Sequence, residues 1–179
     1  MENVLIRIET GIRWVAYAGT LLVIPLMLSM LTEVISRYVF HSPTLWAYET
    51  AYFMTGSFFL LGVAFTLQVG GHVKVDLMTE IFPDSVNHLI YIIGYTLTGI
   101  FVAWTTFGLT ESFLETFHSG ETTGESAWNP VLWPFRLVAA VGFGLFTVQI
   151  AVELTRHIIR LKNGDPFVKK DGLLGEKES

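Results

Sequence analysis

Residues 14–32 read WVAYAGTLLVIPLMLSMLT, a run of 19 residues without Asp, Glu, Lys or Arg. As an α-helix this run would cover roughly 28 Å, about the thickness of the hydrocarbon layer of a bilayer. Three further charge-free runs follow at Thr50–Gly71, Leu89–Thr110 and Leu137–Val152, the last preceded by the apolar, Trp-rich segment Trp128–Phe135. Because these runs are continuous rather than alternating, they indicate helices and not β-barrel strands. The sequence therefore predicts an all-α membrane protein with four transmembrane helices.

The overall composition agrees with a membrane protein. The mean hydropathy is +0.52, and only 15% of the 179 residues are charged, which is less than a soluble domain of this size carries. Four spans leave room for short connections and one tail, so we expect one compact helical unit over residues 1–163. The tail at 164–179 contains Pro166 and several Lys, and is expected to be disordered. Cys is absent, which excludes disulfides and Cys-ligated metals.

The basic residues are distributed unevenly between the connections. Nine of the eleven lie in the N-terminal segment, in the connection between the second and third spans, and in the residues that follow the fourth charge-free run. Only Arg37 and Arg136 lie in the other two connections. The predicted third connection, Glu111–Pro130, carries four Glu and no Lys or Arg, as a translocated segment should. By the positive-inside rule, both termini are expected to be cytoplasmic.

The connection between the second and third spans predicts a short amphipathic helix at Asp76–Pro83. Its apolar residues recur every three to four positions, and its polar residues lie opposite them. Such a helix would lie along the cytoplasmic surface of the membrane. Just before it, His72, Lys74 and Asp76 either extend to the membrane surface or form a polar anchor for the helix, with Lys74 available to anionic headgroups or to a carboxylate.

The sequence offers no group for catalysis or transport. The centres of the four predicted spans contain no ionisable residue, which argues against a transport pathway within this chain alone. All the histidines lie at predicted span ends or in connections, so we expect them to be interfacial or solvated, and a haem between the spans is not expected. They are His41, His72, His88, His118 and His157. No enzymatic activity, cofactor, metal site or nucleic-acid partner is predicted.

Proline and small residues within the spans predict local packing features. Pro25 lies inside the first span and predicts a kink, because proline lacks a backbone N–H. The pairs Gly94/Thr98 and Ala140/Gly144 have the spacing that allows two helices to approach closely. This spacing does not distinguish packing within the chain from packing against a partner.

Charged residues flank the first connection. Glu33 and Arg37 are four residues apart with Glu first, the favourable order for a helical ion pair. The residues alone favour an ordinary interfacial salt bridge. The alternative is that Arg37 and Glu49, on either side of the aromatic segment that ends at Trp46, fix how the first two spans meet, or how they meet another subunit.

The order of these motifs resembles that of a known family. The small, DctQ-like membrane subunit of tripartite ATP-independent periplasmic (TRAP) transporters is similar from the first span through the fourth. The residues that carry the resemblance are Arg37–Tyr38–Val39–Phe40, Pro43, Trp46, Glu49, Gly62 and His72–Val73–Lys74–Val75–Asp76. The outer connection and Pro134 fit more loosely, and the Glu-rich third connection and the Lys-rich tail depart from the pattern.

The resemblance implies a non-catalytic scaffold in the bacterial inner membrane. Its partners would be a large multi-span subunit that carries sodium-coupled uptake of organic acids, a periplasmic substrate-binding protein, and the membrane lipids. As interface or structural residues it implies Arg37, Trp46, Glu49, His72, Lys74 and Asp76. Two other classes stay open at this point, namely a membrane anchor for a redox enzyme and a self-contained small transporter.

Overall fold

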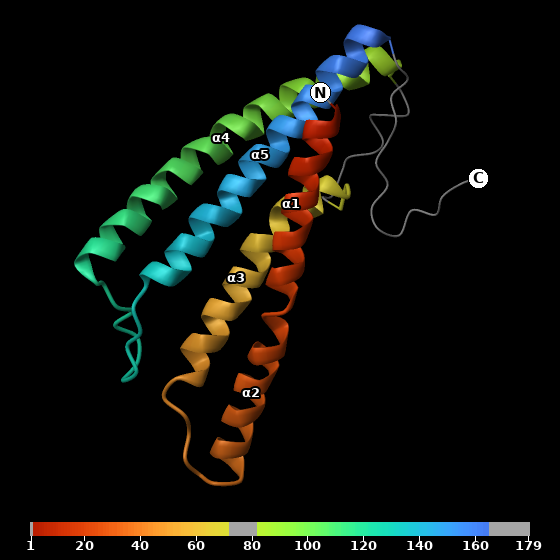
Figure 1. Cartoon of the computed structure of the whole chain (residues 1–179). Coiled ribbons are helices and arrows are strands. Elements are labelled where there is room, and N and C mark those ends of the chain that lie inside the picture. The colour runs from red at the N-terminus through yellow and green to blue at the C-terminus, as the bar shows by residue number, and fades with distance from the viewer. Residues whose placement is uncertain (1, 72–81, 165–179) are drawn as a thin grey trace.

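The computed structural model describes residues 2–71 and 82–164. Its helices are α1 (Glu2–Thr20), α2 (Val23–Tyr38), α3 (Ala47–Gln68), α4 (Asp84–Ser119) and α5 (Trp133–Asn163) (Figure 1). Together α1 and α2 form one apolar run long enough to cross a membrane, and α3, α4 and α5 are the other three. The prediction of four transmembrane helices is therefore confirmed.

The first span is bent where α1 meets α2 (Figure 1). Pro25 has no N–H to donate to the carbonyl of Leu21, which lies four residues earlier. That carbonyl instead accepts a bond from the N–H of Ile24 at 3.2 Å, and the N–H of Leu22 donates to Gly19 at 3.0 Å. These bonds span three residues instead of four, so one turn of the helix is wound more tightly. This turn produces the predicted kink just before the proline.

The helices lie side by side in a row rather than in a closed bundle. In Figure 1 the order across the row is α4, α5, α3 and then α1 with α2, which differs from the order along the chain. Beyond the end of α3, α1 also approaches α5 directly. The described helices thus form an open row, so the helical unit expected over residues 1–163 contains no closed bundle among them. In lipid no hydrophobic force drives helices together, so apolar faces can stay open to the membrane.

Glycines bring α3 and α5 close together. A Cβ at Gly142 of α5 would lie 2.5 Å from the carbonyl oxygen of Leu60 in α3, and one at Gly56 would lie 2.6 Å from the ring of Phe135. By contrast, a Cβ at Gly94, in one of the two predicted packing pairs, would meet nothing within 4 Å. Spacing alone thus did not identify the glycines that permit close contact within the chain.

Helix α4 is longer than the sequence predicted. The connection expected at Glu111–Pro130 begins only at Gly120, whose left-handed φ of 66° ends the helix. Glu111 and Glu115 therefore lie on exposed turns of α4, because a helix can continue beyond the apolar part that the charge pattern marks. The predicted surface helix at Asp76–Pro83 lies almost wholly outside the described residues, and so does the tail beyond Gly164.

Candidate functional site

Polar side chains gather at the two ends of the helical row. We call the end that carries the connections 39–46 and 120–132 the loop end, and the opposite end, where α1 begins and α5 finishes, the terminus end (Figure 1). Two of the predicted site residues, Arg37 and Glu49, make polar side-chain contacts at the loop end.

Glu33 connects α2 to the first of these connections. One of its carboxylate oxygens accepts bonds from Arg37, at 2.8 Å from Nε and 2.5 Å from a terminal nitrogen. The other oxygen accepts from the backbone N–H of Thr44 at 2.8 Å and from the hydroxyl of the same residue. The predicted Glu33–Arg37 pair is confirmed, and its contact with Thr44 fixes the connection that leads into α3.

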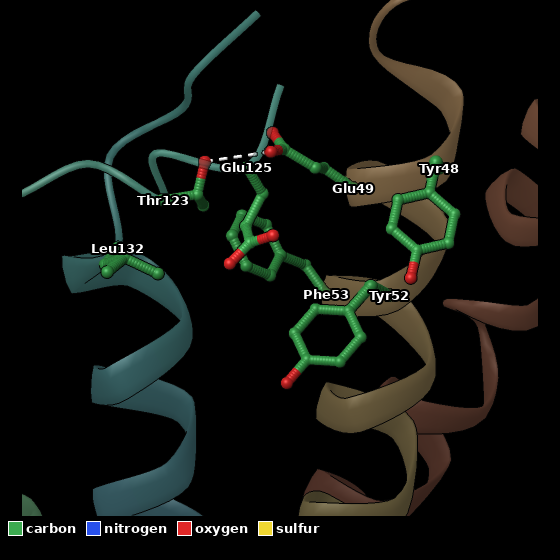
Figure 2. A pocket seen from close by; sticks show the side chains of 7 residues that line it. All are labelled: Tyr48, Glu49, Tyr52, Phe53, Thr123, Glu125 and Leu132. Carbon is green, nitrogen blue, oxygen red and sulfur yellow. Dashed lines mark hydrogen bonds between the residues drawn. The ribbon is translucent and has the colours of Figure 1, made fainter.

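Glu49 lies in the first turn of α3 and is only 3% exposed. Its Oε1 accepts a bond from the hydroxyl of Thr123 at 2.8 Å, so it joins α3 to the connection 120–132 (Figure 2). Its Oε2 is buried and has no hydrogen-bond partner among the described residues. No sequence pattern pointed to Thr123, which lies 74 residues away along the chain.

The connection that carries Thr123 is folded on itself. The backbone N–H of Thr123 donates to the carbonyl of Pro130 at 3.0 Å, and the N–H of Gly124 donates to the side-chain oxygen of Asn129 at 2.7 Å. An antiparallel bridge also pairs Thr122 with Val131. These bonds hold Thr123 in place beside Glu49.

A cavity of about 410 Å³ opens beside Glu49 (Figure 2). It is lined by Tyr48, Glu49, Tyr52, Phe53, Thr123, Glu125 and Leu132. Phe53 stacks on Phe135 of α5, with ring centres 5.3 Å apart. The cavity therefore combines a buried carboxylate, a second and exposed carboxylate from Glu125, and three aromatic rings.

The other predicted site residues are not brought into this cavity. Arg37 engages Glu33 rather than Glu49, and Trp46 precedes α3 with 39% of its surface exposed. His72, Lys74 and Asp76 lie outside the described residues.

Arg136 is the second basic residue at the loop end. It donates to the hydroxyl of Ser112 in α4 and lies 3.4 Å from the carboxylate of Glu121. It therefore holds α5 to α4 at this end. Sequence reasoning used Arg136 only as a marker of membrane topology and did not identify these partners.

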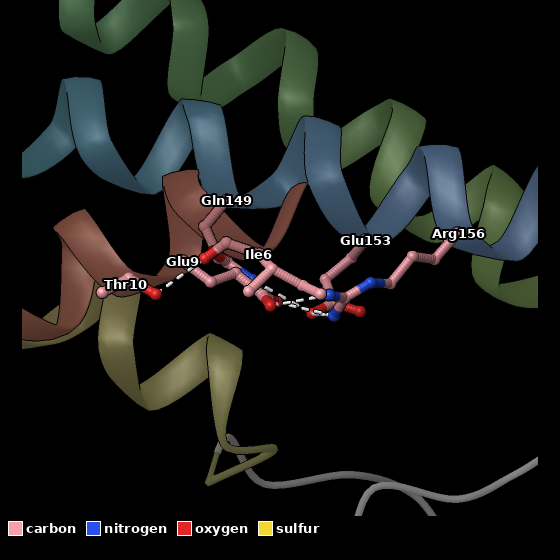
Figure 3. Close-up of polar contacts among 6 residues, drawn as sticks. All are labelled: Ile6, Glu9, Thr10, Gln149, Glu153 and Arg156. Atoms are coloured by element: carbon pink, nitrogen blue, oxygen red, sulfur yellow. Dashed lines mark hydrogen bonds and ion pairs between the residues drawn. The ribbon is translucent and has the colours of Figure 1, made fainter. Parts of the chain in front are cut away.

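A separate ion network lies at the terminus end (Figure 3). Arg156 of α5 donates to both carboxylate oxygens of Glu9 in α1, each at 2.6 Å. It also lies 3.8 Å from Glu153, which accepts a bond from the buried amide of Gln149 at 3.0 Å. Gln149, Glu153 and Arg156 are spaced so that they lie on one face of a helix, and this spacing could have predicted their contacts with one another. No sequence pattern near them pointed to Glu9.

Two histidines meet between α4 and α5 at the terminus end. His88 is 1% exposed and His157 is 8% exposed, and their Nδ1 atoms are 3.0 Å apart. The ring of Tyr91 stacks on His157 at 5.1 Å. The expectation of interfacial or solvated side chains is wrong for both, because the two helices continue past their apolar cores and pack there. Among residues 2–71 and 82–164, no three His, Asp or Glu are placed to hold a metal ion.

The described helices, with polar groups gathered toward both ends of the row, define a multi-pass membrane protein. A family model described as "Tripartite ATP-independent periplasmic transporters, DctQ component" matches residues 26–160, well over half of the chain. The chain belongs to this family, as the sequence motifs predicted.

A curated relative supports the same assignment. The chain is 28% identical over 71 residues to the "Sialic acid TRAP transporter permease protein SiaT" of Haemophilus influenzae (strain 86-028NP). The similar stretch spans 40% of this chain and 12% of that protein.

Proposed function

We propose that this chain is the small, non-catalytic scaffold subunit of a TRAP-type secondary transporter for organic acids. The observation that carries the proposal is the single row of helices, in combination with the family match. Each described helix packs on its neighbours in the row, and no ring of described helices surrounds a channel. A row of this kind leaves two broad apolar faces, which suit contact with a larger membrane protein and with lipid.

The larger permease subunit would carry the sodium-coupled substrate pathway, and a periplasmic binding protein would deliver the substrate. The relative named for sialic acid supports an acidic substrate, although the shared 71 residues cover little of that protein. Dicarboxylates, keto acids and sialic acid are therefore the substrates to test.

The proposed location is the bacterial inner membrane, with both chain termini in the cytoplasm. The charges of the described residues support this orientation. Arg7, Arg13, Arg156, Arg160 and Lys162 lie in the parts of α1 and α5 near the terminus end, whereas the loop end has Arg37 and Arg136. The loop end would then face the periplasm, where the binding protein is found.

Reconstitution into liposomes tests the function directly. We expect sodium-driven uptake of a labelled organic acid when the chain, the larger subunit and the binding protein are all present. We expect none from vesicles that contain this chain alone. Uptake by the chain alone, or undiminished uptake by the larger subunit without the chain, would contradict the scaffold role.

A further inference from the structure

We propose that the cavity beside Glu49 receives a cationic side chain, Lys or Arg, from the larger permease subunit. This inference rests on the proposed function, because it names the contact by which the partner is held. The cavity supplies negative charge and aromatic surface, and the partner would supply a positive charge on an apolar stem.

The buried carboxylate of Glu49 is only partly satisfied by hydrogen bonds. Its carboxylate is nearly fully buried, yet the described residues satisfy only one of its two oxygens, through Thr123. A buried carboxylate costs several kcal/mol unless it is paired. Because Glu49 is one of the residues that line the cavity, its unsatisfied oxygen indicates a missing cation. Glu125 on the exposed part of the wall adds a second carboxylate to the same cavity.

The described residues do not provide that cation. Among the described residues the loop end carries two Arg and no Lys; these are Arg37 and Arg136, and both are engaged elsewhere. Arg37 bonds Glu33, and Arg136 bonds Ser112 and approaches Glu121. Neither lines the cavity.

The aromatic lining favours a cation carried on a side chain. Tyr48, Tyr52 and Phe53 line the same cavity as the two carboxylates (Figure 2). Such rings attract a cation to their faces and pack against the methylene groups of a Lys or Arg stem. A bare inorganic ion would leave this surface unused.

The position of the cavity favours a membrane partner over a soluble one. Tyr48, Tyr52 and Phe59 fall on one face of α3 at helical spacing, and their exposed fractions are 76%, 60% and 67%. This exposed aromatic face runs from the cavity toward the middle of the span. A permease subunit can follow the face into the membrane, whereas a soluble binding protein can reach only its outer end.

The test compares matched carboxylate variants in the full complex. Because the chain has no Cys, Ser179→Cys allows a single fluorescent label for measuring the affinity for the larger subunit in detergent. We expect Glu49→Gln to weaken binding by about 10-fold or more, since it leaves the partner cation unpaired. Glu125→Gln should weaken it less, because that carboxylate is exposed. Glu115→Gln, on an exposed turn of α4, is the control and should leave the affinity unchanged.

A cross-link identifies the occupant of the cavity. Tyr48 replaced by p-benzoylphenylalanine should join, on illumination, to a segment of the larger subunit that contains a Lys or Arg. Neutralising that residue should weaken binding as much as Glu49→Gln does, and combining the two changes should add little further loss. A cross-link that adds only the mass of an amine-headed lipid, or that joins only the binding protein, would overturn the inference.

The two proposals fail in different ways. If the larger subunit does not bind the unmodified chain at all, the scaffold function is wrong. If it binds, and Glu49→Gln binds equally well with helical content preserved by circular dichroism, only the cavity inference is wrong.

Discussion

The two ends of the helical row differ in how their carboxylates are paired. At the terminus end, both oxygens of Glu9 are bonded by Arg156, and Glu153 lies near the same guanidinium. At the loop end, Glu33 is similarly bonded by Arg37 and Thr44, but Glu49 keeps a buried oxygen without a hydrogen bond from the described residues. The terminus end thus pairs these carboxylates within the chain, whereas at the loop end the partner cation proposed above would complete the pairing of Glu49.

The largest effect on stability is expected from Arg156→Gln. Removing this guanidinium leaves Glu9 and Glu153 close together without a cation, which should lower the free energy of unfolding by about 3 kcal/mol. Titration of the purified chain with SDS, followed by circular dichroism, measures this change. Arg160→Gln removes a nearby cation that forms no ion pair in the described structure, and should have little effect. Equal losses for the two variants would show that the terminus-end network is not what joins α1 to α5.

A middle-sized effect is expected from Gly142→Ala, which lies between the two ends. The added Cβ would meet the carbonyl of Leu60 at 2.5 Å, so α3 and α5 must separate, at a cost of about 2 kcal/mol. Gly108→Ala in α4 is the matched control, because nothing lies within 4 Å of its added Cβ. The same SDS titration applies. Equal destabilisation of the control would contradict the assigned close packing of α3 on α5, because Ala by itself favours a helix more than Gly does.

A smaller effect is expected from Glu33→Gln at the loop end. The amide keeps the shape but loses the charge that strengthens the bonds from Arg37 and Thr44, so these bonds should weaken. Hydrogen exchange should rise at the amide of Thr44, while the helices at the terminus end keep their protection. Glu111→Gln, on an exposed turn of α4, provides the reference. Unchanged exchange at Thr44 would contradict the role assigned to Glu33.

The smallest effect on the isolated chain is expected from Glu49→Gln. Loss of charge from a buried carboxylate offsets the weaker bond from Thr123, so stability should change by no more than about 0.5 kcal/mol. The same variant is expected to weaken binding of the larger subunit by about 10-fold or more. A small effect on stability together with a large effect on binding would distinguish the loop end from the terminus end. A loss comparable to that of Arg156→Gln would mean that Glu49 is structural.

Features set by neighbouring residues could be predicted from the sequence. The charge-free runs identified the spans, Pro25 identified the kink, and the four-residue spacing identified the Glu33–Arg37 pair. Each depends on backbone hydrogen bonding or on helix geometry within a turn or two.

Contacts between distant segments could not be predicted in the same way. Glu49 meets Thr123 across 74 residues, and Glu9 meets Arg156 across 147. These contacts depend on the order of the helices across the row. The apolar pattern does not encode this order, because all four spans are similarly apolar. His88 and His157 were expected to be solvated for a different reason, because the charge pattern does not show that α4 and α5 continue past their apolar cores and pack there.

The position of α5 has a consequence for how the chain assembles in the membrane. It packs against both α3 and α4, while those two helices share no comparable contact with each other. Until α5 enters the lipid, α4 has no neighbour from the earlier part of the chain to pack against. Because α5 follows both helices in the chain, the row is complete only when α5 has packed between α3 and α4, and a chain truncated before Trp133 should leave α4 without its contacts to the rest.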